Sequence, residues 1–250
     1  MKQSIATAAI LGFDTATDDS AVAVTRDGDL VSERRAQAPS GERARHASAL
    51  LAQVTEAVDE AGGWDAIGLI AVGVGPGTFT GLRVGVATAR ALSQGLEMPL
   101  APVGSLAALA GGIGEHPAAA SRLRLAAIDA RRDEAFAALY GASGEQLWEP
   151  FVAAPEAIAE RLRDLGDEGD GPPLAAGSGS LRFRPQLEAA GTEVIAAGEP
   201  AHRVWARHVC RLAEAVTPVG PEAVEPVYLR RPDAELWRER DRDGKKRARG

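Results

Sequence analysis

Short apolar or alternating segments at the start of the chain predict strands. Three of them are Ala9–Thr15, Ala21–Thr25 and Leu30–Arg35. Asp27–Gly28 between the last two is a strong hairpin signal, because both residue types tolerate the backbone of a tight turn. The run Ile67–Val74 is nearly continuously apolar, which is typical of a strand buried on both faces of a sheet.

Two further segments show helical periodicity. In the helix predicted over residues 42–61, apolar and small residues recur at spacings of three and four and form one stripe. They are Ala44, Ala47, Leu50, Leu51, Val54, Ala57, Val58 and Ala61. Gly62–Gly63 ends this helix. A second helix is predicted over Thr80–Gly95, so the first hundred residues have the order β-β-β-α-β-α.

The second half begins near Leu123 and roughly repeats this order. The segments LRLAAIDA, EAFAALYG and EQLWEPFVA predict strands, and Ala154–Leu165 predicts a helix with Pro155 in its first turn. PPLAAGSG predicts a short buried strand before a glycine-rich turn, and Ala201–Val216 predicts the last helix.

These patterns predict an α/β protein of two lobes, each with a mixed sheet flanked by helices. The first lobe spans residues 1–105 and the second residues 106–229, and helix 201–216 is a candidate to pack back on the first. Residues 230–250 hold nine Lys or Arg and five Asp or Glu. This segment has little to bury and is predicted to be a disordered tail, either solvated or an auxiliary contact for RNA or a partner.

The charge is uneven along the chain. The net charge of −7 divides into −11 over the first 229 residues and +4 over the tail. Such an acidic body is a poor candidate for gripping RNA over its whole surface. The single cysteine, Cys210, excludes an internal disulfide and fits a reducing cytosol. No apolar stretch is long enough to span a membrane, so we expect a cytoplasmic protein.

The segment GVGPGTFTGLRVG (residues 73–85) concentrates five glycines where a strand turns into a helix. It lacks both the lysine of a Walker A loop and the last glycine of the dinucleotide fingerprint. Two interpretations stay open: a vestigial nucleotide or phosphate corner at the helix N-terminus, or a tight corner with a purely geometric role. The residues of the first interpretation are Asp14, Thr15, Gly75, Gly77, Thr78 and Thr80.

Within the following helix, small residues recur every four positions and form a ridge without large side chains. The ridge consists of Gly81, Gly85, Ala89 and Ser93. Glycine in a helix costs about 1 kcal/mol relative to alanine, so another backbone is expected to come close. The ridge packs either on the chain's own sheet or on a partner helix, a contact in which helix 42–61 can join.

Catalytic groups are scarce in the sequence. His46, His116, His202 and His208 form no paired motif, and one cysteine cannot build a thiolate zinc site. Asp14 and Asp129 follow predicted strands, where actin-like ATPases place acids that serve Mg²⁺ and water. Both also have structural explanations: Asp14 can brace the turn TATDD, and Asp129 opens a surface charge cluster, IDARRDE.

Six segments together carry a resemblance to a known family. They are ILGFDTATDDSAVAV, ERARHASALLAQV, GVGPGTFTGLRVGVATARAL, PVGSLAALA, LAAIDARRDEAFAALY and EPVYLR. In this order, over residues 9–230, they resemble the TsaB (YeaZ) family, bacterial accessory proteins for making threonylcarbamoyladenosine (t6A) next to the anticodon of tRNA. The resemblance implies an actin-like ATPase fold (ASKHA, RNase H-like) of two lobes.

The resemblance also implies a role without catalysis. TsaD, the catalytic relative, carries two metal-binding histidines four residues apart, and these positions fall here on Ser105 and Leu109. Leucine cannot ligate a metal. The implied protein is a scaffold or activator with no catalytic residue, metal or required cofactor, although weak nucleotide binding stays open. It pairs with TsaD through the first-lobe helices, acts together with the ATPase TsaE, and meets tRNA only through the complex.

The expected interface residues lie on the two first-lobe helices. They are His46, Leu50, Val54, Gly81, Arg83, Gly85 and Ala89. The same surface allows a homodimer when the partner is absent. Two alternatives remain at this point: an active actin-like ATPase or small-molecule kinase, which predicts hydrolysis that depends on Asp14, and a metallopeptidase, which predicts a stoichiometric metal.

Overall fold

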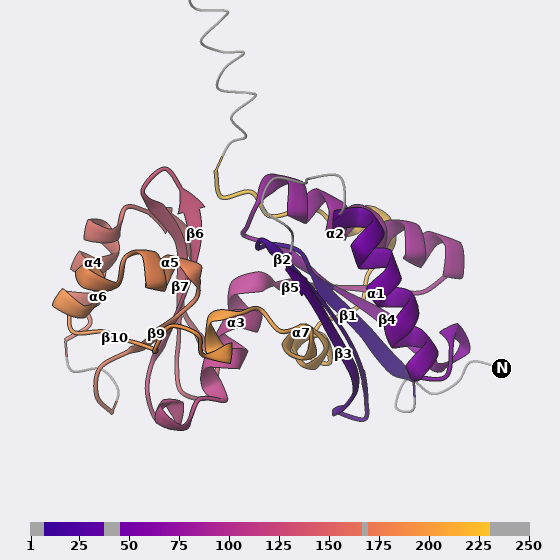
Figure 1. The fold of residues 1–250 in the computed structure, drawn as a ribbon, viewed down its shortest axis with the longest axis horizontal. Coiled ribbons are helices and arrows are strands. Elements are labelled where there is room, and N and C mark those ends of the chain that lie inside the picture. The colour runs from indigo at the N-terminus through magenta and orange to yellow at the C-terminus, as the bar shows by residue number, and fades with distance from the viewer. Residues whose placement is uncertain (1–7, 38–45, 167–169, 231–250) are drawn as a thin grey trace, which may run out of the picture.

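Two five-stranded sheets, each flanked by helices, make up the part of the chain that the structure describes (Figure 1). The structure is a computed structural model and describes residues 8–37, 46–166 and 170–230. The sheets lie side by side with helices between them, which confirms the predicted α/β class with two lobes. Within these ranges no helix has the length and apolar character needed to cross a membrane.

The first sheet has the strand order β3-β2-β1-β4-β5. Its strands are β1 (Ala9–Asp14), β2 (Asp19–Arg26), β3 (Asp29–Gln37), β4 (Ile67–Gly75) and β5 (Leu100–Gly104). β2 pairs antiparallel with β1 and β3, whereas β4 pairs parallel with β1 and β5. Asp27 and Gly28 connect β2 to β3 with φ of 53° and 84°, so the predicted hairpin is confirmed.

Helices cover both faces of this sheet. α1 (His46–Glu60) and α2 (Phe79–Leu96) lie on one face, and α3 (Ser105–Gly114) and α7 (Ala206–Ala213) lie on the other (Figure 1). α7 is shorter than the helix predicted over 201–216, and it packs against β1 and β2. Gly12 on β1 makes room for this contact, because a Cβ there would lie 2.5 Å from Cys210 Sγ.

The second sheet has the order β10-β9-β6-β7-β8. Its strands are β6 (Arg124–Arg131), β7 (Glu134–Tyr140), β8 (Gln146–Ala153), β9 (Leu174–Ala176) and β10 (Glu193–Val194). Its helices other than α3 are α4 (Pro155–Arg163), α5 (Ser178–Arg182) and α6 (Arg184–Ala189). Short 3₁₀ turns are η3 (Trp64–Ala66), η4 (Pro117–Ala119), η5 (Pro200–His202) and η6 (Pro221–Ala223). α4 and α6 share a core with one face of the sheet, and α3 lies against the other, so α3 is enclosed between the two sheets.

The sequence interpretation missed several elements. The segment PVGSLAALA ends β5 and begins α3, which buries Leu106, Leu109 and Ile113. A helix that is apolar all round shows no amphipathic stripe, and this is why α3 was missed. β10, α5 and α6 are too short for periodicity to show. The predicted tail lies outside the described residues, apart from Arg230.

Candidate functional site

Asp14 ends β1 and lies beneath the glycine-rich corner. The residue is only 2% exposed. Ser105 Oγ donates a hydrogen bond to Asp14 Oδ2 at 2.5 Å, and the Ala16 N–H donates to Oδ1 at 2.7 Å. Gly73 leaves space for the carboxylate, because a Cβ there would lie 1.8 Å from Oδ2. Both carboxylate oxygens are therefore engaged within the first lobe.

Burial raises the pKa of Asp14 above its ordinary value, and the hydrogen bonds from Ser105 and Ala16 offset part of that rise. The Ser105 hydroxyl also accepts a hydrogen bond from the Gly75 N–H at 3.2 Å. Ser105 thus links the end of β1 to the end of β4. The bond from the Ala16 N–H to Asp14 is the one expected if Asp14 braces the turn TATDD, the structural explanation given from the sequence, and the link through Ser105 to Gly75 comes in addition.

The glycines of the corner and the ridge face the loop that follows β1. A Cβ on Gly77 would lie 2.3 Å from the Ala16 oxygen, one on Gly81 would lie 1.9 Å from the Thr15 oxygen, and one on Gly85 would lie 2.4 Å from Thr15 Oγ1. Thr15 Oγ1 donates to the Gly81 carbonyl at 2.7 Å, and the Thr78 N–H donates to the Ala16 carbonyl at 2.7 Å. The backbone that comes close to the ridge therefore belongs to this chain.

This packing corrects part of the expected partner interface. Leu50 and Val54 are 0% and 1% exposed because the apolar stripe of α1 packs on the chain's own sheet. Ala89 is equally buried, and Gly81 and Gly85 are covered by Thr15. Their side chains are not available to a partner. Arg83 lies exposed on α2, and the side chain of His46, at the start of α1, lies outside the described residues.

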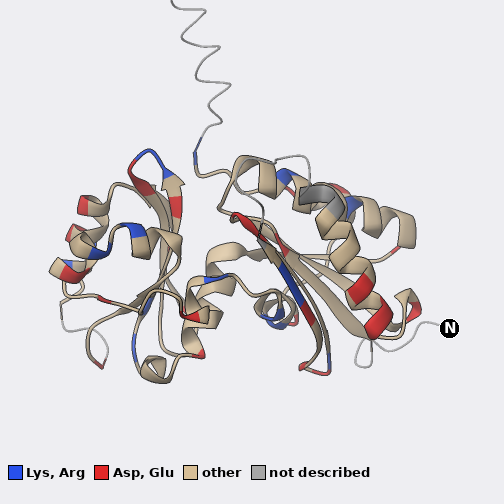
Figure 2. Ribbon diagram, in the orientation of Figure 1, with Lys and Arg blue, Asp and Glu red and all other residues tan. Residues whose placement is uncertain are grey.

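The outer faces of α1 and α2 remain open. Leu51 on α1 is 47% exposed and Phe79 on α2 is 37% exposed. A hollow of about 470 Å³ lies on α2, and its lining residues are Phe79, Thr80, Arg83, Val84, Ala87 and Thr88. α2 carries only two charged residues, Arg83 and Arg90, whereas the last turn of α1 is acidic (Figure 2). Leu51 was counted in the predicted apolar stripe although it lies outside the buried face, and of the residues that line the hollow only Arg83 was among the expected interface residues.

Ser105 and Leu109 lie four residues apart on α3, where the resemblance places metal-binding histidines. Ser105 is fully buried and engaged with Asp14. Leu109 is 1% exposed and packs in the core between the two sheets. Within the described ranges, no group of three or more His, Cys, Asp or Glu is placed to hold a metal ion.

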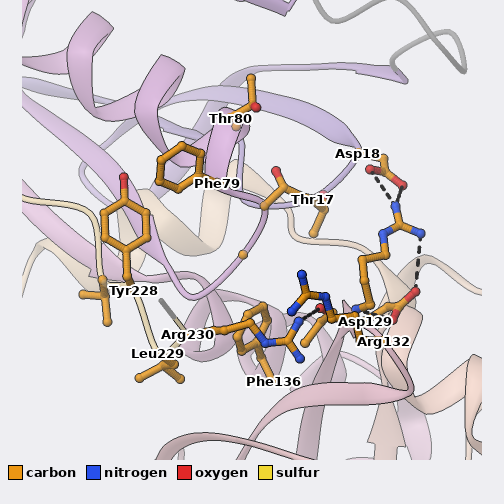
Figure 3. Close-up of a pocket in the computed structure, with 16 residues that line it drawn as sticks. Thr17, Asp18, Phe79, Thr80, Asp129, Arg132, Phe136, Tyr228, Leu229 and Arg230 are labelled. Carbon is orange, nitrogen blue, oxygen red and sulfur yellow. Dashed lines mark hydrogen bonds and ion pairs between the residues drawn. The ribbon is translucent and has the colours of Figure 1, made fainter. Parts of the chain in front are cut away.

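A cleft of about 440 Å³ lies between the two lobes (Figure 3). Its lining includes Gly77, Thr78 and Thr80 from the first lobe and the β6–β7 turn from the second. Three residues of the expected corner thus face the cleft, whereas Asp14, Thr15 and Gly75 lie behind it, buried.

Ion pairs connect the two sides of this cleft. Arg131 lies 3.1 Å from Asp18 across the cleft and 3.5 Å from Asp129 in its own lobe. Arg182 contacts Asp129 at 2.8 Å and Asp133 at 2.7 Å. The charge cluster predicted for IDARRDE is therefore confirmed. Its reach to Asp18 was missed, because sequence spacing does not show which loops face each other.

The chain is similar to proteins of tRNA modification. Residues 32–201 match the model of the TsaD family, tRNA N6-adenosine threonylcarbamoyltransferase. The chain is 32% identical to the tRNA threonylcarbamoyladenosine biosynthesis protein TsaB of Escherichia coli (strain K12). The alignment spans 229 residues and covers 88% of this chain and 94% of that protein. The chain is also 34% identical to the tRNA N6-adenosine threonylcarbamoyltransferase of Syntrophobacter fumaroxidans. That alignment spans 110 residues and covers 39% of this chain and 32% of that protein. The solved structure of YeaZ from Pseudomonas aeruginosa aligns with a TM-score of 0.72 and 28% identity, over 89% of this chain and 100% of that one.

Proposed function

Because the chain belongs to the TsaB family, we propose that it serves as a non-catalytic subunit in the biosynthesis of t6A in tRNA. In this proposal it is a scaffold and activator for the catalytic relative TsaD. The ATPase TsaE completes the assembly, and tRNA contacts this chain only through the complex. Work on tRNA implies the cytoplasm, which stays a prediction.

The observation that best supports the non-catalytic role is that the Ser105 hydroxyl is engaged in hydrogen bonds within the chain. Its hydroxyl stands where the resemblance places a metal ligand, and it is committed to Asp14 and to the Gly75 N–H. A serine hydroxyl held in this way offers no imidazole to a metal, and Leu109 offers no donor atom. Asp14, in turn, is sealed behind the corner rather than exposed in the cleft. We therefore propose that no cofactor is required, and that any nucleotide binds weakly, at the cleft beside Thr78 and Thr80.

The proposed surface for TsaD is the outer face of α1 and α2. The two helices lie next to each other on one face of the first sheet (Figure 1), and Leu51 on α1 and Ala87 on α2 are exposed on their outer side. The face exposes Leu51 and Phe79 together with the small residues Ala87 and Ala91, a composition that allows a second helix pair to approach closely. The same face is the proposed contact of a homodimer when TsaD is absent.

Reconstitution of the tRNA modification tests the proposal. The mixture contains TsaD and TsaE of the same organism, the threonylcarbamoyl-adenylate donor and unmodified tRNA, and each protein is omitted in turn. We expect no t6A without this chain and none with this chain alone. Full product without it would contradict the subunit role. Nucleotide hydrolysis by the isolated chain, abolished by Asp14→Ala, would favour the ATPase alternative.

A pair of matched variants tests the surface. Ala87 in the α2 hollow and Ala157 on α4 are both exposed helical alanines, in different lobes. Ala87→Arg should abolish binding of TsaD in a calorimetric titration, whereas Ala157→Arg should leave it unchanged. Both variants should unfold at the temperature of the unmodified chain, because surface substitutions change stability by only about 0.5 kcal/mol. Equal binding by both variants would place the interface elsewhere.

A further inference from the structure

The last residues that the structure describes cross from the first lobe to the second. Val224 is fully buried in the first-lobe core. The Val227 N–H donates to the Val74 carbonyl at 2.7 Å, at the end of β4. Leu229 then packs against the core between the sheets, and Arg230 reaches the β6–β7 region. Four consecutive residues thus contact both lobes at the mouth of the cleft.

On the first-lobe side, Tyr228 is attached to the beginning of α2. Its ring lies 5.3 Å from the Phe79 ring, measured between centroids (Figure 3). Arg83 Nε donates a hydrogen bond to its hydroxyl at 3.1 Å. The Arg83 guanidinium also lies 3.8 Å above the Phe79 ring. Stacking of a cation on an aromatic face adds to this contact even at an exposed site.

The first turn of α2 lacks a hydrogen bond from a capping side chain. Thr78 is the N-cap residue, but its side chain makes no capping hydrogen bond. The first N–H groups of a helix have no partner within the helix, and an uncapped end is the part that opens most easily. The contacts of Tyr228 with Phe79 and Arg83 therefore add to the hydrogen bond between the Thr78 N–H and the Ala16 carbonyl in holding this end of the helix.

On the second-lobe side, the anchor is Arg230. It donates to the Ala130 carbonyl at 3.0 Å and forms an ion pair with Glu134 on β7. The two side chains of this ion pair are 23% and 35% exposed, so solvent screens it less than the Arg131–Asp18 pair, whose side chains are 63% and 70% exposed.

We propose that Val227–Arg230 acts as an interlobe strap, which positions the first turn of α2 relative to the second lobe. Arg230 and Tyr228 are its positioning residues. Phe79 and Arg83 line the α2 hollow, so the strap reaches the surface proposed for TsaD. This part of the inference rests on the proposed function, and a displacement of the second lobe would then change the affinity for the partner.

Amide hydrogen exchange on the isolated full-length chain tests the strap without any partner. Arg230→Ala removes the second-lobe anchor and touches no residue of α2. We expect exchange at the amides of residues 82–85 to accelerate about threefold, in keeping with the modest strength of a partly exposed ion pair. Arg230→Lys keeps the positive charge and a hydrogen-bond donor, so exchange at these amides should stay as slow as in the unmodified chain. Arg161→Ala is the matched control, because its guanidinium lies 4.4 Å from the Trp148 ring on the far side of the second lobe.

Titration with TsaD supplies the second measurement. Arg230→Ala and Tyr228→Phe should each weaken binding about two- to fivefold, whereas Arg230→Lys and Arg161→Ala should bind as the unmodified chain does. Unchanged exchange in Arg230→Ala would overturn the strap. Faster exchange with unchanged affinity would overturn its link to the interface. If the unmodified chain does not bind TsaD, the proposed function is wrong, and the exchange result alone decides the strap.

Discussion

Replacing Gly81 by alanine should destabilise the protein, although alanine is the better helix former. A Cβ at Gly81 would lie 1.9 Å from the Thr15 carbonyl oxygen and 2.6 Å from Thr78 Oγ1. The first neighbour is backbone, so the loop after β1 has to move. Overpacking a tight site costs about 1–3 kcal/mol, and a clash with backbone belongs at the upper end of that range. The gain in helix propensity is about 1 kcal/mol, so a net loss of about 2 kcal/mol is expected.

Gly95 provides the control in the same helix, because a Cβ there would meet nothing within 4 Å. Gly95→Ala should stabilise by up to about 1 kcal/mol. In a protein of this size, 1 kcal/mol corresponds to about 2–4 °C in Tm, so Gly81→Ala should lower Tm by about 4–8 °C. Gly95→Ala should raise Tm by up to about 2–4 °C. The assay is thermal unfolding of both variants side by side.

The opposite result would refute the packing argument. If Gly81→Ala is as stable as the unmodified chain but no longer binds TsaD, the ridge faces the partner and not Thr15. Such a result would restore the interface first expected from the sequence.

Three further predictions concern buried polar groups. Ser105→Ala removes a hydrogen bond to Asp14 and should lower the free energy of unfolding by about 1–3 kcal/mol. Burial raises the pKa of Asp14, and the hydrogen bond donated by Ser105 offsets part of that rise because it stabilises the ionised carboxylate. Urea titrations should therefore show a larger loss at pH 7 than at pH 4, and an equal loss would contradict this role. Burial lowers the pKa of His208 from 6.5 to about 4. As the pH falls, His208 therefore becomes protonated in the unfolded chain at a higher pH than in the folded chain. The free energy of unfolding should decline between pH 6.5 and 4 by up to about 3 kcal/mol. A flatter pH profile in His208→Gln and an NMR titration of the imidazole check this; a His208 midpoint near 6.5 would contradict it. Gly12→Ala should push α7 away from β1 and speed the reaction of Cys210 with a thiol reagent, because burial raises the pKa of Cys210 to about 12. Unchanged reactivity would mean that α7 does not rest on Gly12.

The sequence predicted the main strands and helices well, because their periodicity reflects local burial. In the stripe predicted for α1, Leu50 and Val54 are buried as expected, whereas Leu51 is exposed. The stripe did not show what buries the first two, since a stripe looks the same under a partner helix and under the chain's own sheet. The spacing of Gly81 and Gly85 likewise predicted a close approach, but only the path of the loop after β1 shows that Thr15 makes it.

The candidate site was predictable only in part for the same reason. Asp14 was found because it ends an apolar strand, and its bracing role was one of the two explanations. The hydrogen bond from Ser105 joins residues 91 positions apart, and the ion pair between Arg131 and Asp18 joins residues 113 apart. Neither contact has a local signal, because the first depends on how the strands of the first sheet are arranged and the second on how the two lobes come together. The same holds for the contact between Tyr228 and Arg83, which are 145 positions apart in the sequence.

These positions bear on how the proposed partner can bind. Most large apolar side chains of α1 and α2 are buried in the chain's own core, and the large exposed ones are Leu51, Phe79 and Leu96. The outer face of α2 also exposes Ala87 and Ala91, whose side chains are too small to insert into a partner. Helices that meet through small residues approach at the short end of the usual 8–10 Å or so between axes. The contact then depends on the absence of bulk at Ala87 more than on any single anchoring side chain. For this reason one added arginine at that position should matter more than the loss of either Leu51 or Phe79.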